Sequence, residues 1–127
     1  MQAASPRSLL IGVWRFDKPR SIAAYKPGKR LDQARIRELF RHTGKIRVRF
    51  TRTHRTLSFQ SVLDRCPYDV LETREATARA RPRIEIVYAL PHGTFRCTIT
   101  FDSADTFFVG IPGRREYFRR VPPAKSS

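Results

Sequence analysis

The sequence predicts a mainly β protein, an eight-stranded antiparallel up-and-down barrel with a helical insertion between its first and second strands. From residue 45 onward apolar and polar side chains alternate with a period of two, which is typical of strands with one buried face. Eight segments qualify if residues 11–16 are the first, and short turns join most of the others. Short turns imply antiparallel neighbours. A meander of eight such strands removes its exposed edges by closing.

The stretch "IGVWRF" at residues 11–16 is expected to form the first strand, and the insertion begins directly after it. Asp17 is a suitable N-cap for a short helix over residues 18–26, which the Pro-Gly pair at 27–28 would end. The sequence therefore predicts a helix directly after the first strand.

A second helix of the insertion is expected from Asp32 to the Thr-Gly pair at residues 43–44, a good C-terminal signal. Three apolar residues follow the i, i+3, i+4 spacing of one helical face, and they are Ile36, Leu39 and Phe40. This helix can cover something apolar, but its stripe is too narrow to be a core by itself.

The other seven strands show the alternation of apolar and polar residues. A hairpin tip is expected at residues 53–55, and Pro67 suits the first position of its strand. The expected strands are residues 45–52, 56–60, 67–75, 83–90, 94–101, 106–111 and 116–121.

The chain has the length of one domain, which we place at residues 8–121 between tails at 1–7 and 122–127.

The alternation predicts an apolar interior and an arginine-rich exterior. An eight-stranded barrel is just wide enough to be filled by side chains or to hold one small ligand. Whether this interior is filled or hollow stays open. Any space is expected to be surrounded by Phe50, Phe59, Ile86, Tyr88, Phe95 and Ile99, with Phe101 and Phe108 also facing inward.

A Gly-x-Trp motif in the first strand is followed by helices, a seven-strand meander and a basic last strand. In this arrangement the chain resembles the calycin group of lipocalins and fatty-acid-binding-like barrels, most closely small bacterial lipocalin-like domains. The resemblance implies that Trp14 closes one barrel end and that Arg119 or Arg120 packs on it. Gly12 would let the backbone pass closely.

The resemblance and the apolar interior favour a non-enzymatic barrel that binds a small apolar or amphiphilic molecule with an acidic head. If the insertion is a lid, its apolar stripe would face the interior. The head group would then pair with basic residues near the lid, and the candidates are Lys29, Arg30 and Arg35.

The formal net charge of +15, from 26 basic and 11 acidic residues, supports an alternative function. Five of the basic residues are lysines and 21 are arginines, scattered along the chain. Such a charge favours nucleic acid or an acidic protein as a partner. The candidate surface is the outer sheet face with Arg47, Arg49, Arg83 and Arg96.

The residues show no catalytic constellation, no metal-binding spacing and no cofactor motif, so we expect no enzyme. Cys66 and Cys97 lack the paired spacing of a zinc site, and we favour free thiols over a disulfide. No stretch approaches the roughly 20 apolar residues of a membrane-spanning helix, and the start of the chain is a poor signal peptide. The compartment stays open: cytoplasmic, or periplasmic or secreted after processing.

Overall fold

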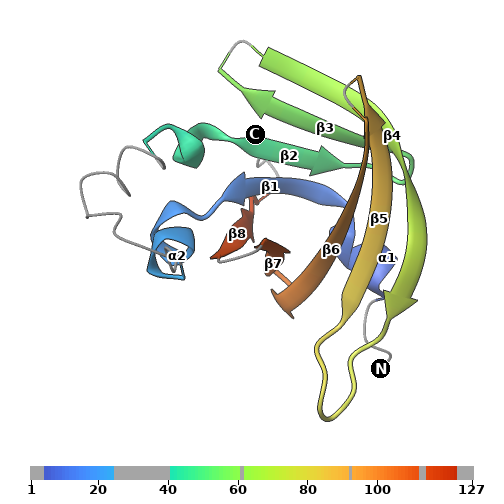
Figure 1. Ribbon diagram of the computed structural model, residues 1–127. Coiled ribbons are helices and arrows are strands. Elements are labelled where there is room, and N and C mark those ends of the chain that lie inside the picture. Colours follow the sequence, from blue (N-terminus) through green and yellow to red (C-terminus); the bar gives the residue numbers. More distant parts are fainter. Residues whose placement is uncertain (1–4, 25–40, 61, 92, 112–113, 123–127) are drawn as a thin grey trace, which may run out of the picture.

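The computed structural model describes residues 5–24, 41–60, 62–91, 93–111 and 114–122 as one barrel with short helical segments (Figure 1). The eight strands are β1 (Gly12–Phe16), β2 (Arg47–Phe50), β3 (His54–Phe59), β4 (Val62–Arg74), β5 (Arg83–Leu90), β6 (Gly93–Ser103), β7 (Thr106–Ile111) and β8 (Arg114–Arg120). The helical segments are α1 (Pro6–Leu10), α2 (Lys18–Ala23) and the 3₁₀ turn η1 (Thr43–Lys45).

Every strand pairs with its neighbours in the sequence, and the sheet closes. The strands lie side by side in the order β1 to β8. The barrel closes because β1 also pairs with β8 in antiparallel fashion, where Trp14 lies opposite Arg120. This confirms the predicted mainly β, eight-stranded antiparallel barrel, with α2 following β1 in the predicted insertion. Closure leaves the first strand with two neighbours and no free edge.

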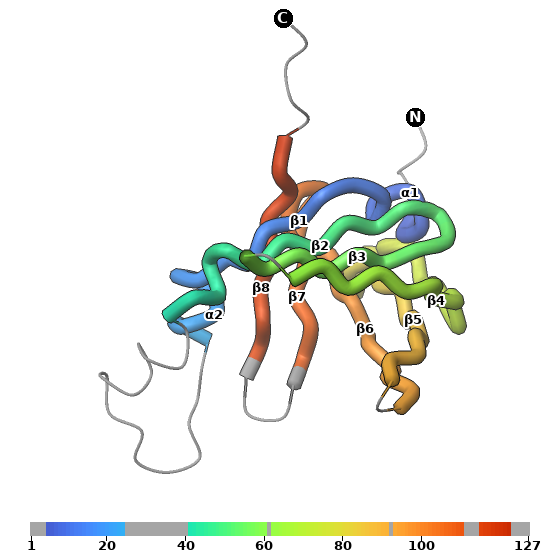
Figure 2. Tube along the Cα trace, turned by 90° about the horizontal axis from the view of Figure 1, so that it is seen from above, coloured from blue at the N-terminus to red at the C-terminus, as the bar shows by residue number. Residues whose placement is uncertain are grey.

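The helices α1 and α2 lie at opposite ends of β1 (Figure 2). Asp17 caps α2 as expected, because its carboxylate accepts a hydrogen bond from the backbone N–H of Arg20. The segment α1 was not predicted, and it begins inside the stretch that the sequence assigned to a tail. Pro6 and Leu10 of α1 are buried against the barrel end, with Ser5 as its N-cap.

The hydrophobic core lies inside the barrel. Trp14 has no exposed surface and packs edge-on against Phe107, with ring centroids 4.6 Å apart. Apolar residues from β1, β2, β4, β5, β6, β7 and β8 complete the cluster, and they include Phe16, Val48, Phe50, Tyr68, Ile84, Ile86, Ile99, Phe101 and Phe118. The predicted alternation of β2, β5 and β6 is therefore correct.

Strand boundaries differ from expectation around the second hairpin. His54 and Arg55 belong to β3 and not to the tip, and β4 begins at Val62 instead of Pro67. β4 pairs with β3 up to Pro67 and with β5 from Tyr68 onward. Proline thus stands where the strand changes partner, a position at which a missing backbone N–H costs little.

One inward assignment was wrong. Phe107 is buried in the core, whereas Phe108 lies on the other face of β7 beneath the guanidinium of Arg115, 4.4 Å from its ring centroid. Two adjacent phenylalanines fit either strand parity, so the sequence could not decide between them. The predicted helix over residues 32–44, with Ile36, Leu39 and Phe40, lies largely outside the described residues.

Candidate ligand-binding site

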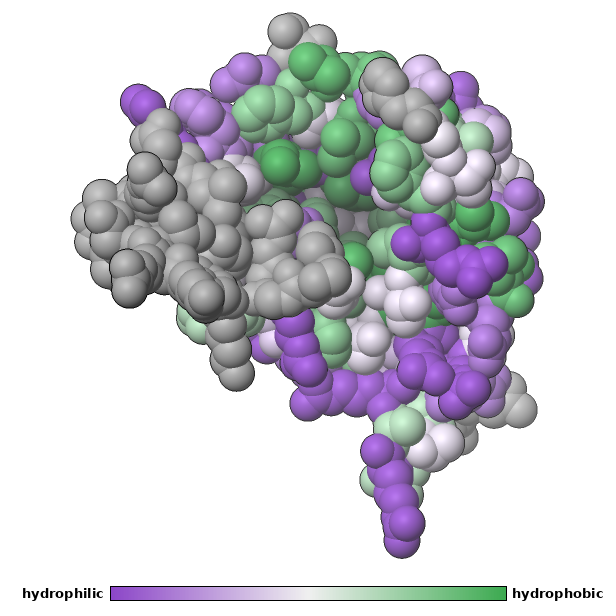
Figure 3. Space-filling model, viewed as in Figure 1, coloured by the Kyte–Doolittle hydropathy of each residue, from purple (hydrophilic) through white to green (hydrophobic). Residues whose placement is uncertain are grey.

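A cavity of about 570 Å³ occupies the part of the barrel away from α1. It reaches from Ile86 and Ile99 in the core to Phe95, Gly110 and Glu116 near the opposite end. Figure 3 shows apolar side chains around a hollow at this end of the barrel. We call this space the barrel cavity, and its remaining lining is Val48, Phe50, Arg55, Tyr88, Arg96, Cys97, Thr98, Phe107, Val109 and Phe118.

Five of the six residues predicted to surround such a space do line it: Phe50, Ile86, Tyr88, Phe95 and Ile99. Phe59 does not, because it lies at the end of β3, where its ring faces His42 at 6.4 Å. Phe95 was expected inside, yet it is 43% exposed. It lies near the start of β6 and stacks on Tyr88.

Arg55 is a charged residue of the cavity lining that the sequence interpretation missed. Its neighbours across the ladder are Phe50 and Cys66, which are both buried, so its side chain shares their inward face. The guanidinium lies 4.5 Å from the centroid of the Tyr88 ring. The signal was present in the sequence, since Arg55 has the same strand parity as Leu57 and Phe59.

The guanidinium of Arg55 makes no ion pair within the described part of the chain. A charged group in an apolar surrounding is costly unless it is paired or hydrogen-bonded, and the contact with the Tyr88 face offsets only part of that cost. Glu116 is the one carboxylate among the described lining residues. The cavity therefore combines an apolar wall with one inward cation that is available to an anion.

Burial perturbs two titratable groups of the cavity. It raises the pKa of the Cys97 thiol to about 11, an effect that Arg55 opposes and Glu116 strengthens. Burial also raises the pKa of the Tyr88 hydroxyl, again against the charge of Arg55. Both groups are neutral near pH 7, so the charge in the lining comes from arginine and glutamate side chains.

The raised pKa of Cys97 predicts slow alkylation. Both cysteines are free thiols in the structure. Because the thiolate is the reacting species, iodoacetamide at pH 8.5 should label Cys97 at least about tenfold more slowly in the folded protein than in urea. Mass spectrometry of quenched samples measures the rates, with Cys66→Ser to isolate Cys97. Equal rates in both states would contradict the burial of this thiol.

The residues predicted to close the barrel meet at the α1 end. Arg120 lies over Trp14, with its guanidinium carbon 4.3 Å from the ring centroid. Its Nη1 donates to the carbonyl oxygen of Ile11 at 2.9 Å. The sequence left Arg119 and Arg120 as alternatives. Arg119 points elsewhere, toward the Asp17 carboxylate 3.6 Å away.

Gly12 lies two residues before Trp14, and a side chain at this position would collide with Arg120. It has φ +139°, a region that disfavours side chains, and a Cβ there would lie 2.6 Å from Nη1 of Arg120. The Trp14 indole N–H donates to the carbonyl oxygen of Leu10 at 2.9 Å. The glycine therefore leaves room for the guanidinium that covers the tryptophan.

Among the described residues, no cluster of histidine, cysteine or carboxylate side chains could hold a metal ion. None of the helices in the same part of the chain is long and apolar enough to span a membrane. Comparison of the chain with protein-family models, with curated proteins and with solved structures finds no match.

Proposed function

We propose that this chain is a non-enzymatic, lipocalin-like barrel that binds an amphiphilic molecule with an acidic head in the barrel cavity. The observation that carries the proposal is the inward cation Arg55 within an otherwise mainly apolar lining. The Gly12–Trp14–Arg120 closure supports the lipocalin-like assignment, since it provides the water-excluding end that the resemblance implies.

The size and lining of the cavity suit one small amphiphile. Its volume of about 570 Å³ lies within the roughly 300–1,000 Å³ of ordinary ligand pockets. Ile86 and Ile99 are almost fully buried at its inner part, and Phe107 and Phe118 close the other side. An acyl chain or a fused ring would cover the partly exposed lining side chains Tyr88, Phe95 and Val109, which is favourable in proportion to the apolar area removed from water.

Arg55 replaces the lid residues Lys29, Arg30 and Arg35 as the proposed partner of the acidic head, because those three lie outside the described residues. A guanidinium offers a planar pair of N–H donors that matches a carboxylate. The head group is expected on the side of the cavity that Arg55 and Tyr88 form, because the inward guanidinium lies there.

Titration with cis-parinaric acid, a fluorescent fatty acid, tests this function. We expect one site, with an affinity that changes less than about threefold between low and high salt, because apolar burial dominates. Arg55→Gln should weaken binding about ten- to hundredfold, the range for loss of a hydrogen bond to a charged group. In displacement assays the same variant should weaken the binding of lauric acid far more than that of lauryl alcohol, which has no carboxylate.

Two further variants separate the interior from the exterior. Ile99→Trp should block the probe by filling the cavity, while Arg47→Glu on the outer face should leave it bound. Val109→Trp repeats the filling test at a half-buried position if Ile99→Trp fails to fold. Loss of binding in Arg47→Glu together with retention in the folded cavity-filling variant would refute the cavity as the site.

A second candidate function is favoured by a row of arginines on the outer face. Arg15 lies directly opposite Arg119 on one side and Arg47 on the other. All three are exposed, and Arg49 and Arg65 lie on the same outer face. Like charges directly opposite each other on neighbouring strands repel and destabilise the sheet. An anionic partner bound at this row would reduce that repulsion.

The predicted basic surface is thereby corrected. Arg47 and Arg49 belong to it, but Arg83 and Arg96 lie on β5 and β6, far around the barrel. There the Arg96 side chain pairs with Glu85 at 3.2 Å, and Glu72 lies beside Arg74. Carboxylates thus compensate charge on that side, whereas Arg15, Arg47 and Arg49 on β1 and β2 form no ion pair among the described residues.

We propose single-stranded nucleic acid as the partner of this row, through its phosphates. Anisotropy of a labelled oligothymidylate should show binding that falls steeply with salt. Arg15→Gln and Arg47→Gln should each reduce the slope of log K against log salt by about one, the effect of losing one phosphate contact. Arg83→Gln is the matched control and should leave the slope unchanged. Equal effects of all three variants, or binding of polyglutamate alone, would reject a nucleic-acid site at this row.

A further inference from the structure

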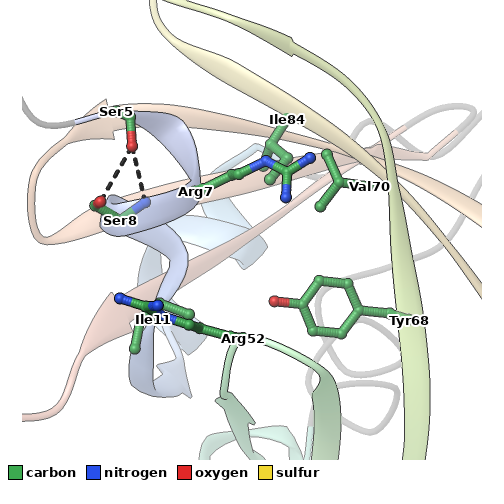
Figure 4. Close-up of a pocket in the computed structure, with 8 residues that line it drawn as sticks. All are labelled: Ser5, Arg7, Ser8, Ile11, Arg52, Tyr68, Val70 and Ile84. Carbon is green, nitrogen blue, oxygen red and sulfur yellow. Dashed lines mark hydrogen bonds between the residues drawn. The ribbon is translucent and has the colours of Figure 1, made fainter.

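The α1 end of the barrel contains a second pocket, of about 520 Å³, between α1 and the wall of β4 and β5 (Figure 4). It is separate from the barrel cavity. Ile84 lines it, whereas Ile86, two residues further along the same face of β5, lines the barrel cavity. We call it the α1 pocket, and it is lined by Ser5, Arg7, Ser8, Ile11, Arg52, Tyr68, Val70 and Ile84.

One side of the α1 pocket is apolar. Ile84 is fully buried, and Val70 packs against the core beside it. The Tyr68 ring completes this wall, held in place because its hydroxyl donates to the carbonyl oxygen of Thr51 at 2.6 Å. The wall offers a fixed surface for a flat apolar group.

Two cations from separate segments also line the pocket. Arg7 belongs to α1, and Arg52 to the turn between β2 and β3. Figure 4 shows the Arg7 guanidinium between α1 and Val70, and the Arg52 side chain extending toward Ile11. Both arginines are exposed at the pocket rim.

No carboxylate lines this pocket within the described part of the chain. There, neither Arg7 nor Arg52 forms an ion pair through its side chain. The hydroxyls of Ser5 and Ser8 lie within 3.1 Å of each other at the same rim and add polar groups that can hydrogen-bond to an anion. The polar side of the pocket is thus positive, and its charge is uncompensated.

From this arrangement we infer that the α1 pocket is a second binding site, for a small organic anion with a phosphate or carboxylate head and a flat apolar body. The head lies between Arg7 and Arg52, where two guanidinium groups donate charge-assisted hydrogen bonds. The body lies on Val70 and the accessible edge of the Tyr68 ring, above the fully buried Ile84. The site is independent of the ligand proposed for the barrel cavity, because the two pockets share no lining residue.

Calorimetric titration with phenyl phosphate and with inorganic phosphate tests the site. Phenyl phosphate should bind about tenfold or more tightly than inorganic phosphate, since the ring adds apolar burial. Arg7→Gln and Arg52→Gln should each weaken phenyl phosphate about tenfold or more. Arg79→Gln, an exposed arginine in the loop between β4 and β5, is the matched control for net charge and should change the affinity less than about twofold.

Arg55→Gln distinguishes this site from the barrel cavity, and it should leave phenyl phosphate binding unchanged. Circular dichroism of each variant checks that the fold is retained, which is expected because Arg7 and Arg52 are exposed. The inference is overturned if phenyl phosphate does not bind, if Arg79→Gln weakens its binding as much as Arg7→Gln, or if only Arg55→Gln abolishes its binding. The last outcome would place the anion in the barrel cavity.

Discussion

Replacing Trp14 with alanine is expected to lower the free energy of unfolding by about 3–5 kcal/mol, as is typical for removing a large aromatic side chain from a core. Trp14 has no exposed surface, packs on Phe107 and Phe101, and is covered by Arg120. Urea denaturation followed by far-ultraviolet circular dichroism measures the effect, since the variant lacks the only tryptophan.

Phe95→Ala is the control for this prediction, because Phe95 is an aromatic residue that remains 43% exposed. It should cost less than about 1.5 kcal/mol, in keeping with its partial burial. In the unmodified protein, Trp14 should emit at short wavelength, as expected for an indole away from water. Equal losses in the two variants, or a water-like emission of the folded protein, would contradict the closure of the barrel by Trp14.

The second large effect is expected at Arg120. Arg120→Met retains part of the apolar stem but removes the donors to the carbonyl oxygens of Leu9, Ile11 and Ala104. We expect a loss of about 2–3 kcal/mol, since hydrogen bonds from charged donors are strong and two of these acceptors are partly buried. The denaturation assay used for Trp14 measures it.

Arg15→Met provides the matched control, because Arg15 is adjacent to Trp14 in β1 but points to the outer face. Arg15 is exposed and forms no ion pair among the described residues, so its loss should cost less than about 1 kcal/mol. A double-mutant cycle of Trp14→Ala with Arg120→Met should show coupling of at least about 0.5 kcal/mol. Additive effects would mean that the stacked guanidinium does not stabilise the tryptophan.

Much of the barrel follows from alternation alone. The inward positions Val48, Phe50, Ile84, Ile86 and Ile99 were all predicted from a period of two, because one face of each strand meets the core and the other meets water. The closure of the barrel was predicted from the short turns and the number of strands. These features depend on the order of neighbouring residues along the chain, so a single sequence is enough to predict them.

The features that the sequence did not reveal depend on contacts between distant segments. Arg55 was assigned to a turn, and its ladder partners Phe50 and Cys66 show that β3 includes it and that its side chain faces inward. The first part of β4 was missed because charges interrupt its alternation. The helix α1 is only five residues long, and its burial depends on the barrel end that Leu10 covers.

The position of a bound fatty acid inside the barrel is the most direct test of the proposed function. In isotope-filtered NOE spectra of labelled protein with unlabelled lauric acid, we expect cross-peaks from the acyl chain to the methyl groups of Ile86, Ile99 and Val109, which line the barrel cavity. Cross-peaks confined to Ile84, Val70 and Ile11 would place the acid in the α1 pocket. That result, or the absence of contacts to either set, would contradict the assignment of the barrel cavity as the ligand site.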